Sequence, residues 1–321
     1  MLCLPEFWEV KNLRKEIVYS MKSIYRDDLE VVGYRFGSGR KTCCIIGGLR
    51  GNEIQQMYIC SQMIKQLSIL EAEGKIRKNR EILVIPCVNH YGMNTGKRFW
   101  GVDGSDINRM FPGYDKGETT QRIAAGVFEE VKDYTYGIQL SSYYMKGEFI
   151  PHVRIMATGY QNVDLANQFG MDYVALRTPE PFDTTTLNYN WQIWNCQAFC
   201  LYTEETQKIH PAAAAGGVEA ILRFLSARGI IDEKVPAGNP HPTLVCTDDM
   251  IPVRSGAGGI YERLKGQGDT IYKGELMGRI VHPYEGTVLD DIISPIDGHV
   301  FFAHRAQMAM EHEILFKVIE K

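Results

Sequence analysis

The sequence lacks three features that would each assign a class of protein. No apolar run approaches the roughly 18 residues of a membrane-spanning helix, and the N-terminal stretch MLCLPEFWEVKNLRKE carries charges where a signal peptide is apolar. Basic residues are not in excess, because the formal net charge is −4. Such a balance disfavours nucleic acid and anionic membrane surfaces as partners. These absences predict a cytoplasmic protein with no nucleic-acid or membrane partner.

The sequence also lacks a Cys-x-x-Cys pair, although it contains eight cysteines. Most of these cysteines lie inside apolar runs, where Cys packs as a small hydrophobic side chain. Cys196 and Cys200, four residues apart, would share one face of a helix as metal ligands, but their segment WNCQAFCLYTEE is more typical of the approach to a strand. Buried, reduced thiols are therefore predicted.

What the chain does contain is an alternation of strand-like and helix-like segments over residues 1–235. Strand-like segments such as TCCIIGG, EILVIPCVN and HVRIMATG are interspersed with the helical patterns EIQQMYICSQMIKQL, QRIAAGVFEEVKDY and GGVEAILRFLSARG. Alternation at this spacing predicts an α/β domain with a mixed, largely parallel sheet flanked by helices. Ligands of such sheets bind at the carboxyl ends of the strands.

A Pro-rich stretch at residues 232–242, DEKVPAGNPHP, reads as a linker. Short strands and turns follow it and predict a small all-β domain over residues 243–321. Its segments KGELMGRI and SPIDGHVFF resemble the two halves of a biotinyl/lipoyl-type barrel-sandwich domain, without the Lys that carries the prosthetic group. We therefore expect no prosthetic group, and a lid or a homo-oligomer contact is the alternative role.

Two motifs carry the chemistry. In GGLRGNEIQ, residues 47–55, Glu53 begins a helical pattern after a Gly-rich turn and is well placed to coordinate a cation. In DINRMFPG, Asn108 and Arg109 present an amide beside a planar guanidinium that matches a carboxylate, and Arg98 supplies a second cation upstream. The alternative for Arg109 is a surface ion pair on a solvated loop.

Taken together, these motifs resemble the succinylglutamate desuccinylase/aspartoacylase family of the zinc carboxypeptidase clan, from about residue 30 to the end of the chain. The resemblance implies zinc-dependent hydrolysis of an N-acyl amino acid, with a His-x-x-Glu pair and a later His as zinc ligands. It assigns Glu53 as a metal ligand and Arg98 as the group that polarises the scissile carbonyl. It further assigns Asn108 and Arg109 to the substrate carboxylate.

The same resemblance places the general base at Glu204 in YTEET, with Glu205 adjacent. Both His ligands of the family are missing here, since Arg50 occupies the first position and Ser141, in GIQLSSYY, the second. A guanidinium keeps its positive charge and repels a dication. Arg50 is expected to pair with Glu53 or Glu204 instead.

Three hypotheses follow. The favoured one is a pseudoenzyme with no metal cofactor that binds a small carboxylate-bearing N-acyl amino acid through Asn108, Arg109 and Arg50. The second is a working metal-dependent deacylase whose zinc site is rebuilt with His90 or His152. The third is metal-free hydrolysis with Arg50 as the electrophile, which lacks the acidified water that zinc supplies.

Overall fold

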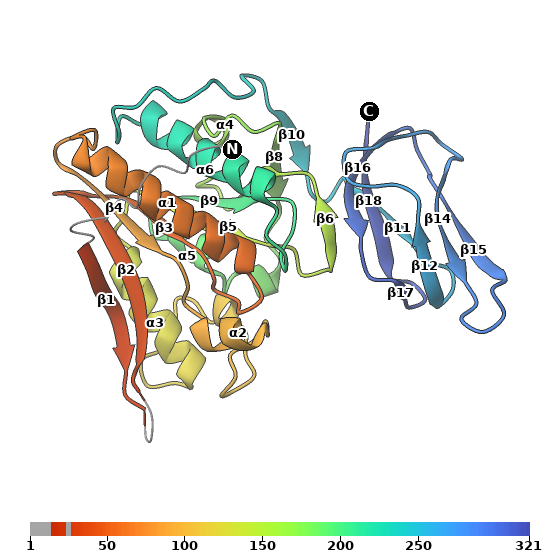
Figure 1. Ribbon diagram of the computed structural model, residues 1–321, viewed down its shortest axis with the longest axis horizontal. Helices are drawn as coiled ribbons and strands as arrows, with labels where there is room; N and C mark the ends of the chain where they lie inside the picture. Colours follow the sequence, from red (N-terminus) through yellow and green to blue (C-terminus); the bar gives the residue numbers. More distant parts are fainter. Residues whose placement is uncertain (1–13, 24–26) are drawn as a thin grey trace, which may run out of the picture.

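The computed structural model describes residues 14–23 and 27–321. Cys3 and the charged N-terminal stretch ahead of residue 14 lie outside these residues, so the predictions made for them are not addressed. The chain forms an α/β part and a smaller β part, joined side by side (Figure 1). Among the described residues, no helix is both long and apolar enough to cross a membrane.

Within the described residues the α/β part is built on a nine-stranded sheet. The pairs β3–β4, β3–β5, β5–β9, β7–β8 and β8–β10 are parallel, whereas β1–β2, β2–β4 and β7–β9 are antiparallel. The mixed, largely parallel sheet predicted from the sequence is thereby confirmed. In order across the sheet, the strands are β1 (Arg14–Met21), β2 (Leu29–Ser38), β4 (Arg80–Ile85), β3 (Lys41–Ile46), β5 (Tyr136–Ser141), β9 (Gln197–Tyr202), β7 (His152–Met156), β8 (Tyr173–Arg177) and β10 (Thr243–Cys246).

Helices cover both faces of this sheet (Figure 1). One core packs α1 (Ile54–Ala72), α4 (Val163–Asn167) and α6 (Pro211–Ala227) against the sheet, and the other packs α3 (Thr119–Val131) and α5 (Leu187–Ile193). The central strands are buried on both faces, which explains their continuous apolar sequences. The short helices α2 (His90–Thr95), η1 (Ile107–Arg109) and η2 (Pro181–Asp183) lie in connecting segments.

The β part consists of two antiparallel sheets that enclose a separate core. One sheet contains β11 (Ile251–Arg254), β18 (Ile314–Glu320), β16 (Gly298–His304) and β13 (Thr270–Ile271). The other contains β15 (Val288–Ile293), β14 (Leu276–Val281), β12 (Gly259–Arg263) and β17 (Met308–Ala309). The C-terminal all-β architecture expected from the sequence is present.

Two strands tie the parts together in ways that the sequence pattern does not show. β6 (Gly147–Phe149), which follows β5 in the chain, pairs with β16 of the β part. Residues 243–246, placed at the start of the β domain by composition, form β10 and extend the large sheet beside β8. The linker therefore ends after this strand, and the loop between β5 and β6 is held against the β part.

Candidate functional site

The site lies where three neighbouring parallel strands end. β5 pairs with β3 on one side and with β9 on the other, so their carboxyl ends meet at one edge of the sheet. The segments that leave this edge are residues 47–53, residues 141–146 and residues 203–208. All three contain residues that the sequence placed in the site.

The Gly-rich turn after β3 brings Arg50 and Glu53 together. Gly48 has a φ of +54°, a conformation that L side chains rarely adopt. At Gly51 a Cβ atom would lie 2.2 Å from the backbone of Gly92, so only glycine fits this close approach. The tight turn lets the backbone N–H of Arg50 donate to Oε2 of Glu53 at 3.1 Å.

Arg50 is the centre of a buried ion-pair network. Its Nε lies 2.8 Å from Oδ2 of Asp106, and its Nη1 lies 3.2 Å from Oε1 of Glu53. Nη2 of Arg98 contacts the same Asp106 oxygen at 3.2 Å, and the Ser142 hydroxyl donates to Oε1 of Glu53 at 2.8 Å. The side chains of Arg50 and Glu53 are only 6% and 1% exposed, so this pair is almost fully removed from water.

The network keeps its members charged in spite of burial. Burial opposes the charged form of Arg50, but Asp106 and Glu53 outweigh it and raise the guanidinium pKa. Burial likewise opposes ionisation of Asp106, and Arg50 and Arg98 reverse this effect, so the carboxyl pKa lies below its usual value. Of the two partners predicted for Arg50, Glu53 forms the ion pair, whereas Glu204 pairs with His210.

The two histidines proposed as replacement ligands are placed differently. His90 begins α2 and packs edge-on against Tyr91, with the ring centroids 4.5 Å apart. His152 is fully buried, its Nδ1 lies 2.7 Å from the carbonyl oxygen of Ile150, and its ring stacks on Tyr202. Burial lowers the pKa of His152 to about 3, so this imidazole stays neutral. Neither ring forms a hydrogen bond or ion pair with Glu53 among the described residues.

The segment after β9 separates the two candidate bases. Glu204 adopts a φ of +66°, lies 2.9 Å from Nδ1 of His210 and accepts a hydrogen bond from Gln267 of the β part. Glu205 instead lines the cavity described below and pairs with Arg305 at 2.5 Å. Of these two glutamates, only Glu205 lines this cavity.

The Asn108–Arg109 pair is occupied by contacts within the chain. Oδ1 of Asn108 accepts the backbone N–H of Leu187 at 3.2 Å. Nη1 of Arg109 lies 3.3 Å from Oδ1 of Asp183, and the guanidinium stacks over the Phe182 ring at 4.9 Å. Arg109 therefore already has a carboxylate partner that a ligand would have to share.

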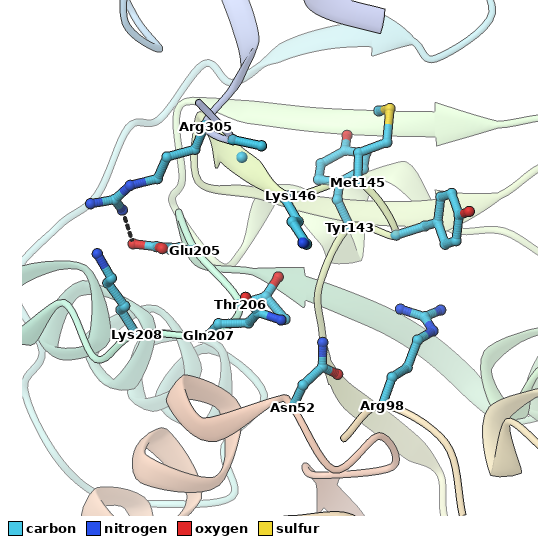
Figure 2. Close-up of a pocket in the computed structure, with 13 residues that line it drawn as sticks. Asn52, Arg98, Tyr143, Met145, Lys146, Glu205, Thr206, Gln207, Lys208 and Arg305 are labelled. Carbon is cyan, nitrogen blue, oxygen red and sulfur yellow. Dashed lines mark hydrogen bonds and ion pairs between the residues drawn. The ribbon is translucent and has the colours of Figure 1, made fainter. Parts of the chain in front are cut away.

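A cavity of about 520 Å³ opens beside the network, between the loops and the β part (Figure 2). Arg98, Lys146, Lys208 and Arg305 outnumber its one acidic residue, Glu205, so the cavity favours an anion. Arg98 comes from the α/β part and Arg305 from the β part, so both parts build the wall. The lining residues are Asn52, Arg98, Tyr143, Tyr144, Met145, Lys146, Gly147, Glu205, Thr206, Gln207, Lys208, Arg305 and Ala306.

Sequence reasoning missed two members of the network, Asp106 and Ser142. Asp106 was inside the quoted motif, two residues before Asn108, but received no role. Its signal was available, because a buried guanidinium at position 50 has five N–H donors, more than one carboxylate can satisfy. Ser142 differs from Ser141 by one position, and only the end of β5 decides which hydroxyl reaches Glu53.

Comparison with known proteins identifies the class to which this fold and site belong. The model of the succinylglutamate desuccinylase/aspartoacylase catalytic domain matches residues 39–227. The chain therefore belongs to the succinylglutamate desuccinylase/aspartoacylase family. A curated relative, the N-alpha-acetyl-L-2,4-diaminobutyric acid deacetylase of Halomonas elongata, is 26% identical over 83 residues, which are 26% of this chain and 22% of that protein.

Solved structures share the fold over nearly the whole chain. A succinylglutamate desuccinylase/aspartoacylase from Rhodobacter sphaeroides is 17% identical, with a TM-score of 0.78, and the match covers 98% of this chain and 97% of that one. A succinylglutamate desuccinylase from Silicibacter sp. TM1040 is 15% identical, with a TM-score of 0.80 and coverage of 95% and 93%. The product-bound ectoine utilization protein EutE (DoeB) from Ruegeria pomeroyi is 15% identical, with a TM-score of 0.78 and coverage of 96% and 94%.

The residues present do not fit the zinc ion that the family implies. Catalytic zinc takes three protein ligands, and among the described residues no three His, Cys, Asp or Glu side chains gather to hold a metal. Glu53, the retained family ligand, is hydrogen-bonded to the fixed positive charge of Arg50. A dication beside Glu53 would face that charge within a buried environment.

Proposed function

We propose that this chain is a metal-free member of its family that binds a small carboxylate-bearing N-acyl amino acid without cleaving it. The observation that carries the proposal is the buried ion pair of Arg50 with Glu53 and Asp106, in which a permanent cation is bonded to the residue that the family resemblance assigns as a metal ligand. The guanidinium groups of Arg50 and Arg98 together balance the charges of Glu53 and Asp106, but they do not acidify a water molecule as zinc does.

The excess of cations in the cavity supports an anionic ligand. Arg98 is bonded to Asp106 yet also lines the cavity, so it is the cation best placed to receive a carboxylate. The acetylated diamino acid in the name of the Halomonas elongata relative supports an N-acyl amino acid as the ligand class. The cytoplasmic location and a homo-oligomeric state stay predictions.

Metal content tests the first half of the proposal. The purified, tag-free protein should retain far less than one zinc per chain after equilibration with zinc and washing, as measured by inductively coupled plasma mass spectrometry. The reason is that Arg50 repels a dication at Glu53. About one retained zinc per chain that disappears in Glu53→Gln would instead favour the working deacylase with relocated ligands.

Ligand binding tests the second half. Arg98→Gln should weaken the binding of an N-acetyl amino acid by about tenfold, because a charged hydrogen bond to a carboxylate is lost. Isothermal titration calorimetry on a panel of N-acetyl amino acids measures this change. Arg279→Gln, which removes an exposed Arg on the β part, is the matched control and should bind like the wild type.

Arg109→Gln separates the two candidate cations. Because Arg109 is held by Asp183, its loss should weaken binding less than the loss of Arg98. An equal or larger loss in Arg109→Gln would show that the Asn108–Arg109 pair contacts the ligand as the sequence motif suggests. Affinity unchanged in both variants would contradict the proposed carboxylate contact altogether.

A further inference from the structure

A second group of cations lies where the large sheet meets the β part. Arg154 on β7 pairs in register with Ala175 of β8, and Met156 pairs with Arg177. Side chains two residues apart on a strand point to the same face, so Arg154 and Arg177 share one face of adjacent strands. Two Arg side chains thus leave the same face of adjacent strands near the end of the sheet.

Lys317 on β18 approaches this group from the β part. Its neighbours Phe316 and Val318 belong to the core of the β part, so Lys317 points away from that core. Ile319, on the same face as Lys317, packs in the small apolar cluster that joins the two parts. Lys317 therefore faces the junction, and the charges of Arg154 and Arg177 contribute, after burial, to lowering its pKa.

These cations have too few carboxylate partners. Asp183 binds Nε of Arg177 at 2.8 Å and is shared with Arg109. Among the described residues, neither Arg154 nor Lys317 forms an ion pair within 4.0 Å, although the more distant Asp248 partly offsets the charge of Lys317.

Arg154 itself is poorly satisfied. Its guanidinium lies over the ring of Tyr202 at 4.8 Å, and Nη2 lies 3.9 Å from Sγ of Cys200, which is a weak acceptor. Its Nε is buried and has no hydrogen-bond partner. A buried donor without a partner is costly, and an oxyanion would satisfy it while neutralising the charge.

This group is next to the cavity but separate from it. Tyr143 lines the cavity, and its hydroxyl is also within electrostatic range of Arg154 and Arg177. None of Arg154, Arg177 and Lys317 lines the cavity itself. Tyr143 therefore borders both regions.

We propose that Arg154, Arg177 and Lys317 form a second anion site, which binds a small oxyanion at the junction of the α/β part and the β part. Its ligand carries either a phosphate or a carboxylate, which are both compact anionic groups of oxygen acceptors. Arg guanidinium forks match both groups, and Lys adds a point charge. The site is distinct from the cavity that serves the proposed function.

Titration of the intact chain with inorganic phosphate and with acetate, followed by calorimetry at low ionic strength, tests this site. At least one of the two anions should bind saturably, and the tighter one identifies the class of oxyanion. Lys317→Gln should weaken this binding about tenfold, and Arg154→Gln at least as much. Arg154→Lys keeps the positive charge and is the second variant to measure in case Arg154→Gln fails to fold.

Two controls make the outcome decisive. Arg279→Gln, on the outside of the β part, should leave anion binding unchanged. Arg98→Gln alters only the cavity, so the anion binding that Lys317→Gln weakens should persist in it, while Lys317→Gln should leave N-acetyl amino acid binding in the cavity unchanged. No saturable binding of either anion, or binding that is lost in Arg98→Gln and kept in Lys317→Gln, would overturn the second site without bearing on the proposed function.

Discussion

Replacing Arg50 with Met is expected to lower the free energy of unfolding by about 3 kcal/mol or more, because it leaves Glu53 and Asp106 as buried carboxylates without their shared cation. Met keeps an unbranched apolar stem in place of that of Arg, so the change mainly removes the guanidinium with its charge and hydrogen bonds. Chemical denaturation of the purified variant, followed by circular dichroism, measures the loss. Glu53 keeps Ser142, and Asp106 keeps Arg98, which limits the loss.

The matched control is Arg279→Met. Arg279 also pairs with a carboxylate, Asp291, at 3.0 Å, but both side chains are about half exposed. An exposed ion pair contributes about 0–1 kcal/mol, so this variant should be nearly as stable as the wild type. The contrary result is that Arg50→Met loses no more stability than Arg279→Met. That result would show that the buried network does not stabilise this edge of the sheet, and that Arg50 does not take the stabilising role of a metal.

Restoring imidazoles should restore metal binding. The double variant Arg50→His/Ser142→His removes the repelling charge and places two imidazoles beside Glu53, which completes the three protein ligands of a catalytic zinc site. We expect zinc affinity to rise at least about 100-fold over the wild type. Mutating residues that only hydrogen-bond to the ligands of a metal already alters its affinity by about 10- to 100-fold. Competition with a chromogenic chelator measures this gain.

The companion variant Arg50→His/Ser141→His decides which serine stands at the ligand position. The family pattern assigns this position to Ser141, whereas the hydroxyl that reaches Glu53 belongs to Ser142. The Ser142 variant should therefore bind zinc more tightly than the Ser141 variant, and the opposite order would favour the sequence alignment. If neither double variant binds zinc better than the wild type, the residues at positions 50, 141 and 142 are not what limits zinc binding.

Local patterns predicted the elements of the fold well. The apolar strand Lys41–Ile46 and the helix Ile54–Ala72 follow directly from periodicity, because burial on two faces or one face imposes a repeat on neighbouring residues. The addition of β10 to the large sheet and the pairing of β6 with β16 were not predictable in this way. These pairings join segments far apart in the chain, and short strands carry little periodic signal.

The residues of the site likewise divide into those that local sequence predicts and those that it does not. The Gly-rich turn fixes the spacing of Arg50 and Glu53, since Gly48 has a positive φ and Gly51 packs closely against the backbone of Gly92. The partner of Arg50 on the other side, Asp106, lies 56 residues away in the chain, and no local pattern links them. Glu204 was assigned by motif, yet its backbone conformation directs it to His210 and Gln267.

By itself, the sequence determined the α/β and all-β organisation, the resemblance to the family and the presence of Arg50 where that resemblance expects a His, because each depends on residue type and local spacing. The tertiary structure alone decided which carboxylates neutralise Arg50, which of two adjacent serines reaches Glu53 and which acidic residue lines the cavity. Distance and orientation govern hydrogen bonds and charge interactions, and both are set by loops that meet only after the strands have paired.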